Sequence, residues 1–419
     1  MTLPTLPTPG ALLSPLALQQ RKNAFTGWRL VALLVGVLGL ISIIRMTTGA
    51  TDLDSSGTMS AAIGLAIPIG LAGLGGLWSE RSGVVNIGLE GMMILGTWGA
   101  GWGGTVYGPW QGLLIGIVLG GLGGLVHAIG TVTFAVDQIV SGVALNLLGL
   151  GATQYLSAVA FKGQTTQSPQ IPALPTFTVP GLSSWLGTIE HHHWFFVSDL
   201  AGPIRAITYQ VPYVSVLAVL LLPITWFVLW RTAFGLRLRS CGEAPYAAES
   251  LGVNVRRYKY IAVVISGALA GFGGAFLATV EAGIYREGQT AGQGFIGLAA
   301  MIFGNWRPMG LAAGATLFGY TNAMQLRSSE AVHALLIVLA LLLVVFAVRS
   351  FIRKQRGQGI ASLVIGIALG VWFFTTKDLP SQVPYMTPYL ATLLVLSLAS
   401  QRLRMPAADG LPYRKGQGK

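Results

Sequence analysis

Long apolar runs, separated by short polar stretches, follow one another from residue 28 to residue 401. About ten or eleven of them reach the roughly 17 to 25 residues with which a helix crosses a bilayer. The pattern therefore predicts an all-α protein, a polytopic transmembrane helical bundle, with spans near 28–44, 58–78, 88–107, 109–131, 135–160, 211–230, 259–280, 294–325, 331–349, 359–375 and 386–401. The run 294–325 is expected to form two pieces, because the stretch from Gly304 to Pro308 breaks it.

Basic residues gather at the ends of these runs. Arg21 and Lys22 precede the first run, and further clusters lie within 231–259, 349–356 and 402–404. If the N-terminus is cytoplasmic, alternate crossings place every one of these clusters on the cytoplasmic side, as the positive-inside rule expects. We therefore expect both termini to be cytoplasmic and the long stretch between the fifth and sixth runs to lie outside.

The runs divide the chain into four parts. They are a Pro-bearing cytoplasmic tail at 1–27, a main transmembrane domain at 28–349 with an extracytoplasmic loop at 162–210 and a cytoplasmic segment at 235–257, an additional pair of spans at 350–401, and a basic cytoplasmic tail at 402–419.

Composition agrees with a membrane protein. Hydrophobic residues make up 53% of the 419 residues and charged ones 10%, against roughly 25% charged in soluble domains. The net charge of +12 lies in the clusters at the run ends, and no basic face with base-reading residues accompanies it, so we expect no nucleic-acid partner.

The single cysteine, Cys241, excludes an intramolecular disulfide. Small-residue pairs such as Gly120 with Gly124 and Gly267 with Gly271 predict close contacts between helices.

Common catalytic motifs are missing from the chain. It has no GxxxxGK[ST] phosphate loop, and neither GxSxG nor HExxH occurs. We therefore expect no enzyme activity, no cofactor and no metal in this chain. The triplet His191 to His193 has no acidic or cysteine partner at metal-ligand spacing, which favours an exposed loop.

Polar side chains inside the apolar runs are the candidates for a solute pathway, because ionisable groups in a bilayer usually face a cavity or each other. Asn86 and Glu90 are four residues apart, on one face if that stretch is helical, and Asp137 and Ser141 have the same spacing. The full set is Asn86, Glu90, Asp137, Gln138, Ser141 and Asn146. Two interpretations remain open: these groups contact solute, or they form hydrogen bonds between helices.

A short amphipathic helix is predicted on the cytoplasmic side from Glu243 to Leu251. Pro245 falls in its first turn, where a missing N–H is harmless, and Gly252 is expected to end it. The helix is too short to span a membrane, so we expect it to lie at the surface and dock into a partner's groove.

Four stretches carry a resemblance to a known family. They are SERSGVVNIGLEG at 79–91, DQIVSGVALNLLGLG at 137–151, the segment around GEAP at 242–245, and TAGQGFIGLAAMIFGNWRPMGLAAGATLFGYTNAMQLR at 290–327. Together they resemble the permeases of ABC importers for branched-chain amino acids, ribose and nucleosides, and most closely the nucleoside and simple-sugar branch. The resemblance covers roughly residues 58–349, and the pair of spans near 359–375 and 386–401 departs from it.

The resemblance implies an ABC-importer permease in the bacterial plasma (inner) membrane that moves a nucleoside or related sugar-like solute inward by alternating access. It implies a cytosolic ABC ATPase that binds the ATP, a second permease subunit of the same or a homologous chain, and an extracytoplasmic substrate-binding lipoprotein. It also implies that the ATPase contacts the coupling residues Gly242, Glu243, Ala244, Pro245, Ala247, Ala248 and Gly252. The alternative is an ion-coupled secondary transporter of a small polar solute, with Glu90 or Asp137 as the coupling carboxylate.

Overall fold

A computed structural model describes residues 27–161, 167–327, 329–376 and 403–416, with the isolated residues 380 and 386. Its helices are α1 (Gly27–Thr48), α2 (Ser56–Arg81), α3 (Leu89–Tyr107), α4 (Pro109–Ala128), α5 (Gln138–Ala160), α6 (Leu182–His191), α7 (Val197–Ala206), α8 (Tyr213–Arg231), α9 (Ala233–Glu243), α10 (Pro245–Ser250), α11 (Val255–Phe276), α12 (Gln293–Phe303), α13 (Pro308–Arg327), α14 (Ser329–Ile352) and α15 (Arg356–Thr375). Short turns of other helix types lie at η2 (Thr51–Leu53), η3 (Ile129–Thr133) and η4 (Leu277–Glu281), and β1 (Thr176–Phe177) pairs antiparallel with β2 (Val211–Pro212).

The predicted all-α, multi-pass architecture is confirmed. In the described residues, seven helices are long and apolar enough to cross a membrane: α2, α4, α5, α8, α11, α14 and α15. The predicted runs at 28–44, 88–107 and 294–325 also form helices, as α1, α3 and the pair α12 and α13. The predicted span at 386–401 and the tail before residue 27 fall outside the described residues.

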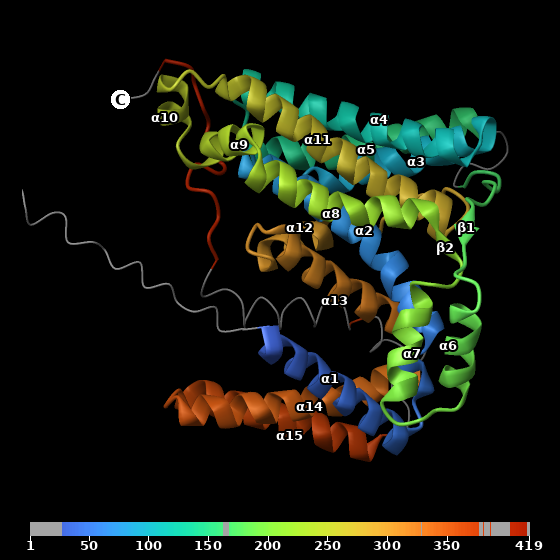
Figure 1. Ribbon diagram of the computed structural model, residues 1–419. Coiled ribbons are helices and arrows are strands. Elements are labelled where there is room, and N and C mark those ends of the chain that lie inside the picture. The colour runs from blue at the N-terminus through green and yellow to red at the C-terminus, as the bar shows by residue number, and fades with distance from the viewer. Residues whose placement is uncertain are drawn as a thin grey trace, which may run out of the picture.

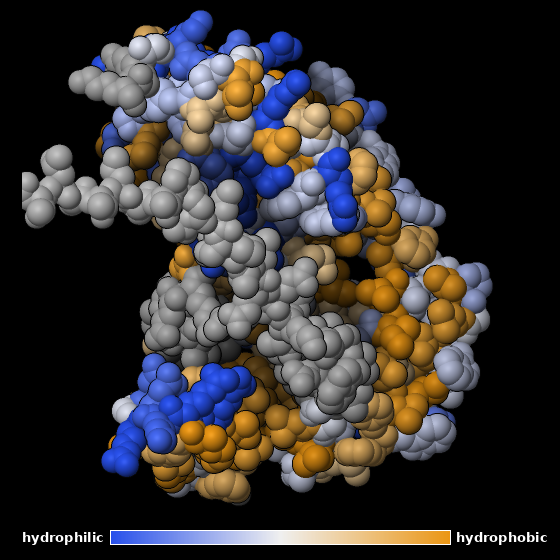
Figure 2. Space-filling model, turned by 60° about the vertical axis from the view of Figure 1, so that its left-hand side comes forward, coloured by the Kyte–Doolittle hydropathy of each residue, from blue (hydrophilic) through white to orange (hydrophobic). Residues whose placement is uncertain are grey.

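The basic clusters lie together at one end of the molecule. In Figure 1 the turn between α14 and α15 and the short helix α10 are both on the left, while α6 and α7 lie on the right. Figure 2, which brings the left side forward, shows hydrophilic surface gathered at the top and at the lower left of that face. We call this end, with residues 231–259 and 349–356, the basic end, and the opposite end the α6 end.

Glycines let α4 and α11 pack with their backbones in contact. A Cβ added to Gly120 would lie 2.4 Å from the carbonyl oxygen of Gly267, and one added to Gly124 would lie 2.5 Å from that of Val263. The small-residue spacing therefore predicted this helix contact correctly. The core that surrounds it consists of buried side chains of α2, α3, α11, α12 and α13.

One non-helical segment enters this core, and a second lies at its edge. After α2 ends at Arg81, residues 82–88 turn back without forming a helix, and most of them are buried. Asn86 then lies beside Ser266 of α11, and α3 begins at Leu89. The second segment, residues 282–292, connects η4 to α12. Non-helical backbone inside a membrane is tolerated only where protein buries it or where it lines a cavity.

Candidate functional site

The predicted surface helix at the basic end is present as α10, but it begins two residues later than expected. It was expected from Glu243 to Leu251, but Glu243 is the last residue of α9, and α10 begins at Pro245. The physical reason is Ala244, whose extended backbone (φ −148°) reflects the exclusion of helical geometry from a residue that precedes proline. Gly252 ends the helix as predicted, with a φ of +81° that favours glycine.

One face of helix α10 packs against the rest of the protein, and the other face is exposed. Pro245 and Ala248 are buried, whereas Ala247 is exposed. Tyr246 is 39% exposed and Leu251, just after the helix, is 84% exposed. Gly242 holds the preceding turn against α2, because a Cβ there would lie 2.4 Å from the carbonyl oxygen of Arg81. Of the residues named from the resemblance, Glu243, Ala244, Ala247 and Gly252 are therefore exposed, beside the apolar tip at Leu251, while the others are buried beneath them.

The C-terminal segment 403–416, which we call the strap, packs against this surface. The backbone N–H of Ala408 donates to the carbonyl of Gly242 (2.8 Å), and that of Ala407 donates to Oε2 of Glu243 (3.2 Å). Tyr413 is buried against Cys241, Ala248 and Val255, and its ring lies 5.5 Å from that of Tyr246. The sequence showed only a basic tail here, because none of these contacts leaves a periodic signal.

The strap also reaches the end of α2. Asp409 is 7% exposed and lies beside Glu80, and burial raises the pKa of Asp409 to about 7. Glu80 in turn accepts a hydrogen bond from Nε1 of Trp306 (2.5 Å), and Arg81 donates to the Trp306 carbonyl oxygen (2.7 Å from Nη2). The predicted turn between α12 and α13 is thus tied to α2.

The stretch around Asn86 corrects one prediction. Asn86 and Glu90 do not share a helix face, because Asn86 lies in the non-helical segment and α3 begins only at Leu89. Gly83, in this segment, has a φ of +82° and breaks the helix. Nδ2 of Asn86 donates to Ser266 (2.8 Å), and its Oδ1 accepts from the N–H of Gly88 (3.1 Å).

Glu90 caps the helix that follows the second non-helical segment. Its carboxylate accepts from the backbone N–H groups of Gly292 (3.0 Å) and Gly294 (2.7 Å), at the N-terminus of α12. A carboxylate is stabilised there by the unpaired N–H groups and the helix dipole. Glu90 therefore fixes where α12 begins.

Three of the other four candidates hold the loop and α3 in place. Oε1 of Gln138 accepts from the N–H of Val85 (2.6 Å), Oδ1 of Asn146 accepts from that of Gly91 (2.7 Å), and Ser141 contacts Nδ1 of His127 (2.9 Å). The ring of His127 reaches the Val85 carbonyl with its other nitrogen.

Asp137 has a different role. It caps α5 by accepting from the N–H groups of Ile139 and Val140. The interhelical hydrogen bonds of the second interpretation are therefore present for most of the set, while solute contact by these residues stays a prediction.

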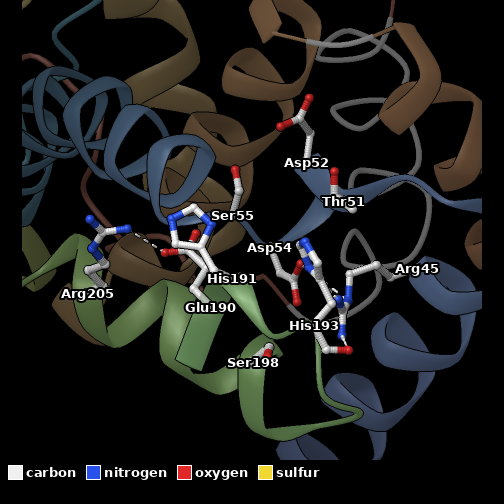
Figure 3. A pocket seen from close by; sticks show the side chains of 10 residues that line it. All are labelled: Arg45, Thr51, Asp52, Asp54, Ser55, Glu190, His191, His193, Ser198 and Arg205. Carbon is white, nitrogen blue, oxygen red and sulfur yellow. Dashed lines mark hydrogen bonds and ion pairs between the residues drawn. The ribbon is translucent and has the colours of Figure 1, made fainter. Parts of the chain in front are cut away.

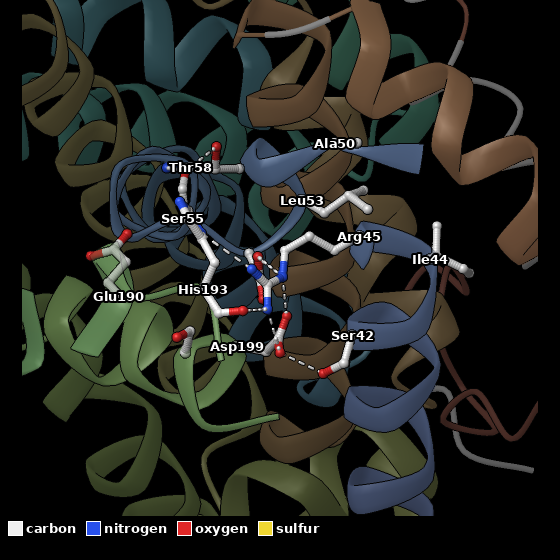
Figure 4. Close-up of polar contacts among 12 residues, drawn as sticks. Ser42, Ile44, Arg45, Ala50, Leu53, Ser55, Thr58, Glu190, His193 and Asp199 are labelled. Carbon is white, nitrogen blue, oxygen red and sulfur yellow. Dashed lines mark hydrogen bonds and ion pairs between the residues drawn. The ribbon is translucent and has the colours of Figure 1, made fainter. Parts of the chain in front are cut away.

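A polar cluster that the sequence did not reveal closes the α6 end. Arg45 of α1 is 5% exposed and forms an ion pair with the fully buried Asp199 of α7 (2.7 Å), and Ser42 donates to the same carboxylate (2.5 Å). Figure 4 shows these side chains converging from α1 and the α6–α7 hairpin. Burial opposes ionisation of Asp199, but its hydrogen bonds, including that from Arg45, outweigh burial and lower its pKa to about 2.

The same cluster binds the start of α2. Glu190 accepts from the N–H of Ser56 (2.6 Å) and pairs with Arg205 (2.9 Å), beside a cavity of about 160 Å³ (Figure 3). His191 to His193 are exposed, as expected, at the end of α6 and in the turn after it, and His193 also contacts Arg45 (3.2 Å). An arginine at the end of the first apolar run was the one signal of this cluster in the sequence.

The fold and these surfaces define a multi-pass membrane transport protein. The family described as "Branched-chain amino acid transport system / permease component" matches residues 58–348, and this chain belongs to it. It is a transport component rather than an enzyme. The chain is 37% identical to the guanosine ABC transporter permease protein NupQ of Bacillus subtilis, over 85% of this chain and 96% of that protein.

Two further relatives differ in the solute that they name. The nucleoside ABC transporter permease protein NupC of Lactococcus lactis is 35% identical, over 84% of this chain and 94% of its own length. TsgC13 of Haloferax volcanii, an ABC transporter permease whose name refers to glucose, is 36% identical over 66% of this chain and 79% of its own. No solved structure matches the chain.

Proposed function

We propose that this chain is the permease subunit of an ABC importer for nucleosides. The observation that carries the proposal is the surface formed by α10, whose apolar tip projects from the basic end. Leu251 is 84% exposed and follows directly on a helix that Gly242 and the strap fasten to the membrane domain. An amphipathic or apolar tip of this kind fits a groove on a partner protein.

The partner at this surface is a cytosolic ATPase, which binds ATP outside this chain. The basic end is then cytoplasmic, with both termini on that side of the inner membrane, and the α6 end receives solute from an extracytoplasmic binding lipoprotein. A second permease subunit, of the same or a homologous sequence, completes the pathway. The similarity to the guanosine and nucleoside permeases, which extends over most of each chain, supports nucleosides as the solute.

The burial and hydrogen bonds of Glu90 favour ATP-driven import over ion-coupled transport. A carboxylate that carries a coupling proton must exchange it with water during the cycle. Glu90 is 7% exposed and both of its oxygens accept backbone N–H groups, which makes it a cap of α12.

Affinity purification with paired variants tests the proposal. We expect the tagged chain to bring down an ATPase, and Leu251→Glu to lose it, because a charge at the tip opposes burial in a groove. Ile352→Glu is the matched control, since Ile352 is 78% exposed at the same end but lies at the α14–α15 turn. The proposal is wrong if no ATPase accompanies the wild-type chain, or if both variants retain it equally.

A further inference from the structure

The non-helical segment 282–292 runs along α3 and α5 from the α6 end into the interior. At its start, the N–H of Ser168 donates to the carbonyl of Tyr285 (2.9 Å), in the outer loop. Further on, the side chain of Gln154 on α5 donates to Glu287. The segment finishes where the N–H groups of Gly292 and Gly294 meet Glu90 of α3.

The position of these contacts along α5 gives their depth. Helix α5 is a membrane-spanning helix from Gln138 to Ala160, and a Cβ on its central residue Gly149 would lie 2.7 Å from the carbonyl oxygen of Gly91. Gln154 is then about 9 Å from the outer end of the helix at 1.5 Å per residue. The segment therefore descends to about the middle of the membrane without forming a helix.

The described residues leave much of this segment exposed. Gln154, Gly288 and Ala291 are exposed, and Glu287 is partly exposed. Lipid-exposed irregular backbone does not occur at this depth, and a carboxylate there faces a cavity or another protein surface. This face of α5 and the segment beside it must therefore line a polar space or a subunit boundary that contains one.

Unpaired polar atoms lie along the same strip. Nε2 of Gln289, Oε1 of Gln293 and Nε1 of Trp98 are buried without a hydrogen-bond partner among the described residues. Trp98 and Gln293 are only 8% and 9% exposed. A buried polar group without a partner costs on the order of 1–3 kcal/mol or more, so three of them beside one segment call for a polar ligand.

We propose that Gln154, Glu287, Gln289, Gln293 and Trp98 form the solute-contact strip of the pathway, and that its ligand is a ribonucleoside. The inference rests on the proposed function and names its site. The carboxylate and the amide oxygen accept from ribose hydroxyls, while the amide NH₂ and the indole N–H donate to base edges. The stacked rings of Trp98 and Trp102, 5.9 Å apart, offer a flat aromatic surface for a base.

The glutamines Gln289 and Gln293 provide the test. We expect Gln289→Leu and Gln293→Leu to lower ATP-dependent guanosine uptake by the full assembly about tenfold or more, because each removes a hydrogen-bonding group from the solute. Gln293→Leu leaves the thermal stability of the purified chain unchanged or raised, because an apolar group of similar size replaces a buried amide oxygen that has no partner among the described residues. Gln289→Leu lowers the stability slightly, because Oε1 of Gln289 accepts from the N–H of Arg286. Gln358→Leu, at an exposed glutamine of α15, is the matched control and keeps wild-type uptake.

A binding measurement separates this inference from the proposed function. Guanosine should raise the unfolding temperature of the wild-type chain and of Gln358→Leu, but not that of Gln293→Leu. If Gln289→Leu and Gln293→Leu import guanosine at the wild-type rate, or lose uptake only in proportion to lost stability, the solute-contact strip is wrong and the proposed importer function is unaffected. Guanosine binding that Gln293→Leu abolishes, in a chain whose uptake needs no ATP, overturns the importer while the strip stands.

Discussion

Single buried charges decide where the helices of this protein begin and how its two ends are closed. Glu90 fixes the N-terminus of α12 inside the membrane domain, and Asp199 fixes the α6–α7 hairpin to α1. Each carboxylate is satisfied by several donors. A buried charge with all of its partners is tolerated, but it becomes costly when one partner is removed.

Asp199→Asn tests the ion pair that holds the α6–α7 hairpin against α1. The change breaks the short ion pair and leaves the buried Arg45 with only the longer ion pair to Asp54 (4.0 Å), so we expect a loss of about 3 kcal/mol of stability, measured as the shift in thermal unfolding in detergent. Asp52→Asn is the control, because Asp52 lines the cavity beside Arg45 and forms no ion pair with any of the described residues. Equal shifts in the two variants would contradict the assignment.

Asp409 gives the strap a pH dependence. The folded-state pKa, about 7, lies above the ordinary value of 3.8, so the carboxyl favours docking in its protonated form. Its contribution is fully present below about pH 4 and is lost as the pH rises through 7. The groups that face it are Glu80, which lowers its pKa through a hydrogen bond, and Lys259 and Arg81, which lower its pKa through their charges, but burial outweighs all three.

The measurement is the unfolding temperature of the purified chain at pH 5.5 and at pH 8. We expect the wild type to lose stability at the higher pH, and Asp409→Asn to lose much less. A decrease of the same size in both proteins would assign the pH effect to another group.

At the scale of elements, the strap is the least expected feature. It ties α9 and α10 to the end of α2 and, through the N–H of Arg404 and Oδ1 of Asn305 (2.7 Å), to the α12–α13 turn. The strap therefore connects α10 with α12, the helix whose N-terminus Glu90 caps. Short elements that are held by few contacts of their own depend on such neighbours.

Tyr413→Ala should uncouple α10 without removing it. The buried ring packs against Ala248 and Cys241, so its loss leaves a cavity under the helix that costs about 3 kcal/mol locally. We expect solute-stimulated ATP hydrolysis by the assembly to fall several-fold while the ATPase still co-purifies. Leu411→Ala, at a strap residue that is 58% exposed, should have no effect. Equal stimulation in both variants would exclude a coupling role for the strap.

The elements that the sequence predicted share a local cause. Apolar length gave the spans, glycine spacing gave the α4–α11 contact, and Pro245 with Gly252 gave the limits of α10 to within two residues. The sequence did not reveal that residues 82–88 enter the core, because they carry no periodic signal, or that residues 282–292 lie at membrane depth, because their polar side chains are typical of a surface loop. It also missed the Asp199 and Tyr413 contacts, which join positions more than 150 residues apart or at the chain end.

For the molecule as a whole, the two ends have different tasks. The α6 end is closed by the ion pairs of Arg45 and Arg205, and the basic end presents α10 and the strap. The strip along 282–292 begins near the α6 end and ends at Glu90 of α3. The helix α12 that follows is linked to the basic end through the contact between Arg81 of α2 and Trp306. A cycle of alternating access can use this connection, because the same helices reach both ends.

ATP-dependent uptake in vesicles is the most direct test of the central claim. Vesicles that contain this chain with its co-purifying ATPase and second permease, supplied with the binding lipoprotein and labelled guanosine, should accumulate guanosine only when ATP is present. Leu251→Glu should abolish this uptake, and Ile352→Glu should not. Uptake of equal rate without ATP, or uptake that Leu251→Glu leaves intact, would contradict the account.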